Sequence, residues 1–207
     1  MSEFDLKAKA WDSNPMHVAR SAAVAEHIMK LIPVNRNMKA LEFGAGTGMT
    51  SMHLSDKLQH ITMMDNSQGM VDIMEEKIRN GKIVNLSAVR FDLEKEDYKD
   101  GKFDLIFTQM VLHHVSDTGR IIKKFADLLN KGGYIAIADV YSEDGSFHGT
   151  GFNGHKGFDP EDLSKLLNRN GFYNTTHMPC FTIEKAIEDG TMKKFDVFIL
   201  TAQYMPV

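Results

Sequence analysis

The chain has 207 residues, of which 43% are hydrophobic and 25% are charged, and these proportions are typical of one globular domain with its own core. Its formal net charge is −4, so no excess of basic residues is available for phosphate backbones, which disfavours nucleic acid as a substrate. The single cysteine, Cys180, excludes an intrachain disulfide and a cysteine-based zinc site.

Hydropathy along the chain bears on its location. The sequence has no run of about 18 apolar residues that could cross a membrane. Its start, MSEFDLKAKAWD, lacks the apolar stretch of a secretory signal. We therefore expect no membrane span and a cytoplasmic protein.

Helical and strand patterns alternate from residue 14 onward. A helix is predicted over 14–32, because Asn14 can cap it, Pro15 suits its first turn, and apolar residues from Val18 to Ile28 recur at helical spacing. Buried strands are predicted at 38–44, 60–65, 83–92, 103–110 and 133–140. The helices between them are predicted at 48–58, 67–80 and 117–133.

The last part of the chain departs from this alternation. A glycine-rich stretch, 141–158, precedes a helix at 159–171, and two strands at 172–186 and 193–205 follow with no helix between them. The pattern predicts a single α/β domain over 1–207. It would be a doubly wound, mostly parallel seven-stranded sheet with helices on both faces and a C-terminal antiparallel hairpin.

The first predicted strand ends in EFGAGTG, where the loop of an open α/β sheet can meet a ligand. A dinucleotide fingerprint would need a glycine at position 49, which is Met49, and no phosphate-binding G-K-[ST] follows. Asp65 ends the second strand about 20 residues on, where a carboxylate can accept hydrogen bonds from ribose hydroxyls. The loop thus predicts a nucleoside site without a pyrophosphate, although Asp65 could instead cap the helix that follows it.

Five segments in order resemble the successive motifs of class I S-adenosylmethionine-dependent methyltransferases, in the small-molecule branch that includes quinone-biosynthesis enzymes. They are ALEFGAGTG (40–48), ITMMDNSQGMVDIMEEKI (61–78), VRFDLE (89–94), FDLIFTQMVLHHV (103–115) and LLNKGGYIAIADV (128–140). The C-terminal hairpin also agrees with the Rossmann-like fold of that family.

The resemblance implies a set of cofactor-binding residues. Gly44, Gly46 and Gly48 would let the backbone wrap S-adenosyl-L-methionine. Glu42 would hold the amino end of the cofactor, which would also explain a carboxylate in a buried strand. Asp65 would bind the ribose hydroxyls.

The same resemblance assigns the adenine end and the fourth strand. Asn66 would lie beside the adenine, Asp92 would accept from its amino group, and Leu93 would offer its backbone N–H. Thr108 would present its carbonyl to the cofactor's ammonium. For Asp92 the alternative is the start of a solvated charged loop.

Histidines are the candidates for catalysis. His113 and His114 follow the fourth strand, and a neutral imidazole near pH 7 can accept a proton; of the two we favour His114. His155 and His148 lie in the stretch 141–158, predicted as an acceptor-side loop. His148 and His155 could be metal ligands with Asp139, but no recognisable ligand spacing supports this, so no metal is predicted.

Residues 1–33 are expected to form an N-terminal helical cap, in which Trp11 packs on the core or covers the cofactor. Arg20 could meet an acidic acceptor, but a solvated helix face is the expectation for it. The predicted function is transfer of a methyl group to a small organic acceptor by in-line displacement at the cofactor's sulfonium. One alternative is a non-catalytic S-adenosylmethionine-binding protein. Another is an NAD(P)-dependent oxidoreductase, which the spacing of the glycines disfavours. The acceptor atom and the oligomeric state are left open by the sequence.

Overall fold

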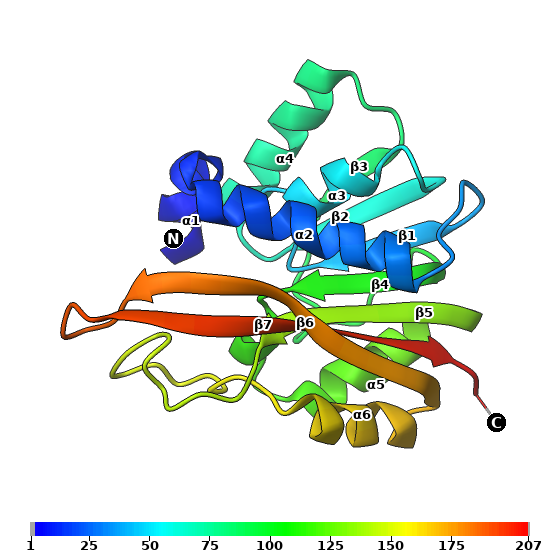
Figure 1. Ribbon diagram of the computed structural model, residues 1–207. Coiled ribbons are helices and arrows are strands. Elements are labelled where there is room, and N and C mark those ends of the chain that lie inside the picture. Colours follow the sequence, from blue (N-terminus) through cyan, green and yellow to red (C-terminus); the bar gives the residue numbers. More distant parts are fainter. Residues whose placement is uncertain (1–2, 207) are drawn as a thin grey trace.

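A computed structural model describes residues 3–206, so the outermost residues of the predicted domain and cap lie outside it (Figure 1). The strands are β1 (Lys39–Phe43), β2 (His60–Asp65), β3 (Leu86–Arg90), β4 (Phe103–Gln109), β5 (Leu129–Val140), β6 (Phe172–Ala186) and β7 (Met192–Tyr204). The α-helices are α1 (Glu3–Lys7), α2 (Pro15–Leu31), α3 (Met49–Leu54), α4 (Gln68–Gly81), α5 (Thr118–Leu128) and α6 (Pro160–Arg169). Two 3-10 helices are η1 (Ala8–Ser13) and η2 (Leu112–His114).

The seven strands form one sheet in the order β3-β2-β1-β4-β5-β7-β6. The first five strands pair in parallel, whereas β7 runs antiparallel to both β5 and β6. The chain order reverses between β1 and β4, which is where open α/β sheets bind their ligands. The predicted fold class is confirmed.

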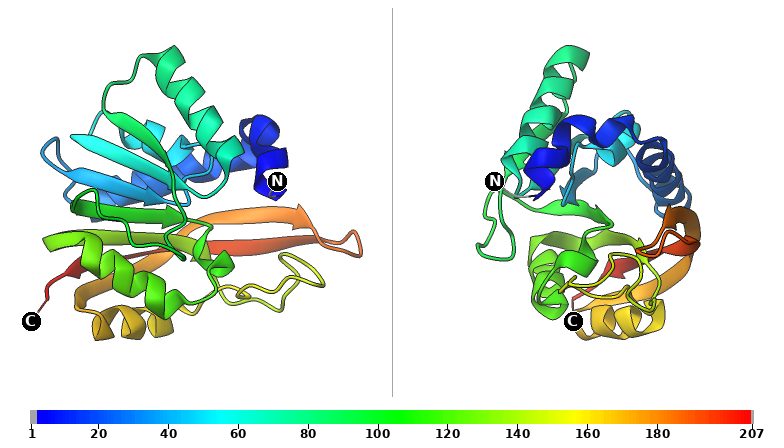
Figure 2. Two further views of the ribbon diagram at one scale, coloured as in Figure 1. Left: turned by 180° about the vertical axis from the view of Figure 1, so that it is seen from behind. Right: turned by 90° about the vertical axis from the view of Figure 1, so that its left-hand side faces the viewer.

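Successive residues of the central strands point into two separate hydrophobic clusters, as the pleat of a strand requires. Ala40 packs with α2, α3 and α4 on one face, and Leu41 packs with α5 and α6 on the other. Figure 2 shows these helices on opposite sides of the sheet. Both faces are therefore covered, which explains why the parallel strands are continuous apolar runs.

Several predicted boundaries are wrong, and two of them have a clear tertiary cause. Helix α3 ends at Leu54 rather than 58, since the Asn85 amide donates to the carbonyls of Ser55 and Leu58 at 2.6 and 3.2 Å. Strand β5 begins at Leu129, inside the predicted helix. There the Asn130 amide bonds Asp104 at 2.8 Å across an irregularity between β4 and β5.

Strand β3 is also shorter than predicted, because the side chain of Val84 is 95% exposed and contributes nothing to the core. The N-terminal helices α1 and η1 lie at the edge of the sheet where β1 and β4 end. The irregular loop 141–158 lies at the same end (Figures 1 and 2). These two segments lie beside the cavity that most of the predicted site residues line.

Candidate active site

A cavity of about 870 Å³ opens at this edge of the sheet. The glycine loop after β1 lines one part of it, which we call the glycine-loop half. The segment around η2, the loop 141–158 and β6 line the other part, which we call the histidine half. The volume is near the upper end of small-molecule sites, so it suits a nucleoside-sized ligand together with a second small molecule.

All three glycines of the loop have left-handed backbone conformations, with φ of +66° at Gly44, +56° at Gly46 and +76° at Gly48. A Cβ on Gly44 would lie 2.4 Å from the Val111 side chain, so only glycine fits there. Gly44 and Gly46 line the cavity, whereas Gly48 packs behind it against Met63. The G-x-G-x-G spacing therefore shapes both the cavity wall and the entry into α3.

Asp65 supports the glycine loop from β2. Its two carboxylate oxygens accept the backbone N–H of Gly46 at 2.8 Å and of Ser67 at 2.9 Å. Burial raises the pKa of Asp65 above its ordinary value. The cap of α4 is Ser67, whose hydroxyl accepts from Met70, so Asp65 is not needed for capping. Its carboxylate lines the cavity beside the exposed Asn66, and its oxygens can accept further hydrogen bonds.

Glu42 lies on β1 beneath the glycine loop and is 3% exposed. The Ser51 hydroxyl donates to its carboxylate at 2.5 Å. Burial raises the pKa of Glu42 to about 8, despite hydrogen bonds from Ser51 and Thr50 that favour the ionised form. A buried carboxylate of this kind is costly to ionise alone and would be stabilised by a cation in the cavity.

The remaining residues predicted for the cofactor occupy two kinds of position. Asp92 and Leu93 line the cavity. Asp92 also accepts from the Glu94 backbone at 3.2 Å and pairs with Lys95 at 2.7 Å, so it begins a turn as well. Thr108 is 2% exposed and is not among the described residues that line the cavity. Their binding roles stay predictions.

The histidine half is built on η2, directly after β4. His113 is 1% exposed, and its Nδ1 lies 2.6 Å from Asp139 at the end of β5. The other Asp139 oxygen accepts the His113 backbone N–H at 3.2 Å. Asp139 thus holds both the ring and the backbone of His113, and Nε2 is left as the ring nitrogen that can act in the cavity.

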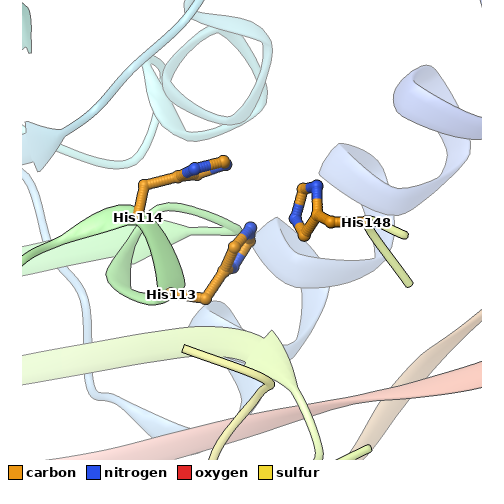
Figure 3. A group of neighbouring side chains, drawn as sticks. All are labelled: His113, His114 and His148. Atoms are coloured by element: carbon orange, nitrogen blue, oxygen red, sulfur yellow. The ribbon is translucent and has the colours of Figure 1, made fainter. Parts of the chain in front are cut away.

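His114 and His148 complete a group of three imidazoles with His113 (Figure 3). His148 comes from the loop 141–158, and its ring stacks on Phe152 with a centroid separation of 3.9 Å. Burial, together with the positive charge that His113 and His114 can carry, lowers the pKa of His148 to about 4. A neutral His148 is therefore expected at physiological pH.

His155 occupies a different place from the other three histidines. Its Nε2 lies 3.1 Å from the Val115 carbonyl, and its backbone N–H donates to the His113 carbonyl at 2.8 Å. It is not among the described residues that line the cavity. A catalytic role for His155 stays a prediction, and its contacts favour holding η2 in position.

Arg20 corrects the expectation of a solvated helix face. It is 6% exposed and lines the cavity, and burial lowers its pKa to about 10. Its Nε has no hydrogen-bond partner within the described chain. The buried stripe of α2 runs through Arg20, Val24 and Ile28, whereas Val18, placed on the apolar face from its hydrophobicity, is 41% exposed.

The N-terminal segment is tied to the glycine-loop half by two aspartates that sequence reasoning missed. Asp5 accepts from the Ser67 hydroxyl at 2.6 Å and from the Gly69 backbone at 3.0 Å. Asp12 accepts from Thr47 at 2.5 Å and pairs with Lys77. No local pattern marks these residues, because each partner lies far away in the sequence. Trp11 lines the cavity from this segment, together with Phe4.

Comparison with known proteins agrees with this geometry. Residues 16–182 match the family model described as a methyltransferase domain. The chain belongs to this family. No helix among residues 3–206 of this methyltransferase domain is both long and apolar enough to cross a membrane.

Relatives of this methyltransferase domain are diverse. It is 31% identical over 147 residues to an uncharacterized methyltransferase of Schizosaccharomyces pombe, covering 63% of this chain and 51% of that protein. It is 24% identical over 115 residues to the demethylmenaquinone methyltransferase of Listeria welshimeri, covering 54% and 49% of the two chains. The chain therefore spans about half the length of these relatives.

Among solved structures, a SAM-dependent methyltransferase from Aquifex aeolicus superposes with a TM-score of 0.69 at 17% identity, over 97% of this chain and 98% of that one. This likeness establishes a shared fold. The fold and the family together agree with the resemblance inferred from the sequence motifs.

Proposed function

We propose that this chain binds S-adenosyl-L-methionine in the glycine-loop half of the cavity and transfers its methyl group to a small organic acceptor in the histidine half. The observation that carries the proposal is Glu42, a buried carboxylate with a raised pKa on the cavity wall. An ammonium group of the cofactor would supply the cation that this carboxylate lacks. The membership of the methyltransferase domain family supports the same conclusion.

The other residues of the glycine-loop half also fit the cofactor. Asp65 presents a carboxylate that can accept from two neighbouring ribose hydroxyls. The third glycine of a dinucleotide site is replaced by Met49, which lines the cavity. The site therefore favours a nucleoside joined to an amino acid over a nucleoside diphosphate.

When bound, S-adenosylmethionine supplies a methyl group activated by a positively charged sulfur. The chain's own contribution is to position the acceptor and to exclude water. Phe4 and Trp11 cover the cavity from the N-terminal segment, and Phe152 lies in the loop on the opposite side. His113, His114 and His148 receive the reacting atom of the acceptor and promote the loss of its proton.

A small acceptor is supported by the enclosure of the cavity between these two segments. The similarity to a demethylmenaquinone methyltransferase also supports an acceptor of small-molecule size. A cytoplasmic location is part of the proposal, in keeping with a chain that has one cysteine and no possible intrachain disulfide.

The test is a thermal-shift titration with S-adenosylmethionine, S-adenosylhomocysteine and NAD in parallel. A ligand at about 100 times its Kd stabilises the native state by about 2.7 kcal/mol, so the first two should raise the Tm and NAD should not. Transfer of a labelled methyl group to members of a metabolite library then reads the activity. Stabilisation by NAD alone would refute the proposal, and binding without any transfer would reduce it to a binding protein.

A further inference from the structure

The three imidazoles of the histidine half form a donor set of the kind that holds a metal ion. We propose that His113, His114 and His148 bind one divalent transition metal, with Zn²⁺ as the best match, and leave one coordination position open to the cavity. The binding itself follows from the geometry of these residues. The use of the metal in methyl transfer rests on the function proposed above.

The distances support a common ion. One ligand nitrogen from each ring lies within 4.8 Å of the other two. Nitrogens bound at 2.0–2.1 Å to a tetrahedral Zn²⁺ are roughly 3.4 Å apart, so closing the site requires each pair to approach by about 1.4 Å at most. His114 and His148 are exposed, so theirs are the rings that would move to close this distance, while His113 stays buried. Figure 3 shows that the rings come from two segments and converge on one space.

Asp139 gives His113 the outer partner that metal-binding histidines usually have. Its carboxylate lies 2.6 Å from Nδ1 and is 0% exposed, so it fixes the tautomer in which Nε2 carries the free lone pair. Nε2 is then the nitrogen of His113 left to bind an ion in the cavity that this residue lines. The carboxylate and the histidine of a carboxylate–histidine–metal arrangement are thus already in place.

The loop that carries His148 is anchored on both sides of this residue. The Lys185 ammonium donates to the Phe147 carbonyl at 2.6 Å, and the Glu188 carboxylate accepts from the Thr150 backbone at 2.6 Å. Stacking on Phe152 then restricts the ring of His148. An exposed histidine held in this way loses less conformational entropy when it binds a ligand.

The loop also packs directly on η2, which keeps the two segments of the site together. A Cβ on Gly154 would lie 2.3 Å from the His113 carbonyl, so glycine is required for this close approach. The backbone N–H of His155 donates to the same carbonyl at 2.8 Å. The fold therefore assembles a ligand set that the spacing of histidines in the sequence does not indicate.

Three neutral imidazoles leave the full charge of the metal for the fourth ligand, as in other three-histidine zinc sites. An acceptor oxygen or sulfur bound there would have a lower pKa. Its proton would leave to water, and the lone pair would remain on the acceptor atom as the nucleophile. This assigns the acceptor to molecules with an ionisable hydroxyl, enol or thiol group.

The test is titration of the untagged, chelator-treated full chain with Zn²⁺ by calorimetry, and with Co²⁺ by its visible absorption spectrum. We expect one ion per chain and a tetrahedral Co²⁺ spectrum. His148→Ala and His114→Ala should each weaken Zn²⁺ binding at least tenfold, and Asp139→Asn should weaken it about 10- to 100-fold. His53→Ala, an exposed histidine of α3, is the matched control and should bind the ion like the wild type.

The absence of stoichiometric binding to the wild type would overturn the proposal. Unchanged binding in both His148→Ala and His114→Ala would also overturn it, since these exposed residues can be replaced without touching the core. S-adenosylmethionine binding is measured separately on the metal-free chain. Loss of the metal site and failure of the proposed methyl transfer therefore give different results.

Discussion

The two halves of the cavity are built in opposite ways. In the glycine-loop half, Glu42 and the three glycines lie within seven consecutive residues, and Asp65 ends the neighbouring strand. The histidine half draws on η2, β6 and the loop 141–158, with Asp139 of β5 behind His113, and these segments are distant in the sequence. The residues of the glycine-loop half are therefore mostly close together in the sequence, whereas those of the histidine half are brought together only by folding.

The largest expected effect lies in the histidine half. Replacing His113 with alanine should lower turnover by about 10²- to 10⁴-fold, because the ring that Asp139 orients can then no longer promote the loss of the acceptor's proton. The Kd for S-adenosylmethionine should change little, since the bonds that hold His113 go to Asp139 and the loop 141–158. The measurements are single-turnover methyl transfer and calorimetric cofactor binding.

His60→Ala is the matched control for this change, because His60 is half-buried and bonds Ser87 at 3.0 Å at the opposite edge of the sheet. The sequence favoured His114, but the carboxylate partner of His113 predicts that His113 is the more important of the two. Full turnover by folded His113→Ala, with a Tm like that of the wild type, would contradict this assignment.

In the glycine-loop half, a substitution should lower cofactor affinity more than turnover. Asp65→Asn removes the charge that accepts from Gly46 and, in the proposed site, from the ribose. Cofactor affinity should therefore fall about 10- to 100-fold, which matches the cost of a hydrogen bond to a charged group. Turnover at saturating cofactor should be affected less. Calorimetry reads the affinity and initial rates read the turnover.

Asp104→Asn provides the control for Asp65, since Asp104 also accepts a backbone N–H, from Lys39 at 2.9 Å, but lies at the other end of the sheet. Cofactor affinity should be unchanged in that variant. Equal losses of affinity in Asp65→Asn and Asp104→Asn would mean that the sheet, rather than a ribose contact, is being perturbed.

The same division explains what could be predicted from the sequence. Buried strands can be recognised in the sequence as apolar runs. The absence of a helix between the last two strands also correctly indicated the antiparallel hairpin. The end of α3 could not be predicted, because it depends on Asn85. The burial of Arg20 could not be predicted either, since α2 presents to the sheet a stripe that passes through this charged residue.

In the candidate site, too, the features fixed by local sequence could be predicted, and those that depend on tertiary contacts could not. The glycine loop and Asp65 line one cavity because strand ends and tight turns fix their positions locally. The pairing of His113 with Asp139 and the approach of His148 require the complete sheet and the anchored loop. Histidine spacing alone carries no information about such contacts.

A smaller effect, which depends on pH, should come from Glu42. Its pKa of about 8 in the native state is higher than the ordinary 4.5, so its contribution to stability is greatest at low pH and is lost as the pH rises through 8. Each pH unit in this window costs about 1.4 kcal/mol. Glu42→Gln should remove this slope, which chemical denaturation of the ligand-free chain from pH 5 to about 8 will show.

Cofactor binding should display the opposite sign at Glu42. An ammonium favours the ionised carboxylate, but the cofactor's α-amino group itself has an ordinary pKa of about 7.7–8.0. Wild-type affinity should therefore rise only about two- to threefold between pH 7 and about 8, and fall at higher pH as the ammonium loses its proton. Glu42→Gln should be nearly flat over this range. Asp65 is the nearby acid that also raises the pKa of Glu42, so the Asp65→Asn variant should shift the wild-type profile to lower pH. A wild-type affinity that is independent of pH would contradict a contact with Glu42.

The smallest effect should come from the connection between the N-terminal segment and the glycine-loop half. Asp12→Asn breaks the pair with Lys77, whose partners are 37% and 27% exposed, so about 0.2–1 kcal/mol is at stake. Cofactor dissociation should become about two- to fivefold faster, because the segment that carries Trp11 is held less firmly. Stopped-flow release of S-adenosylhomocysteine measures this rate. Asp56→Asn, which breaks an exposed pair with Lys57 far from the cavity, should leave it unchanged. If Asp12→Asn also leaves it unchanged, the segment lines the cavity without restraining the ligand, and the covering role assigned to Trp11 has to be given up.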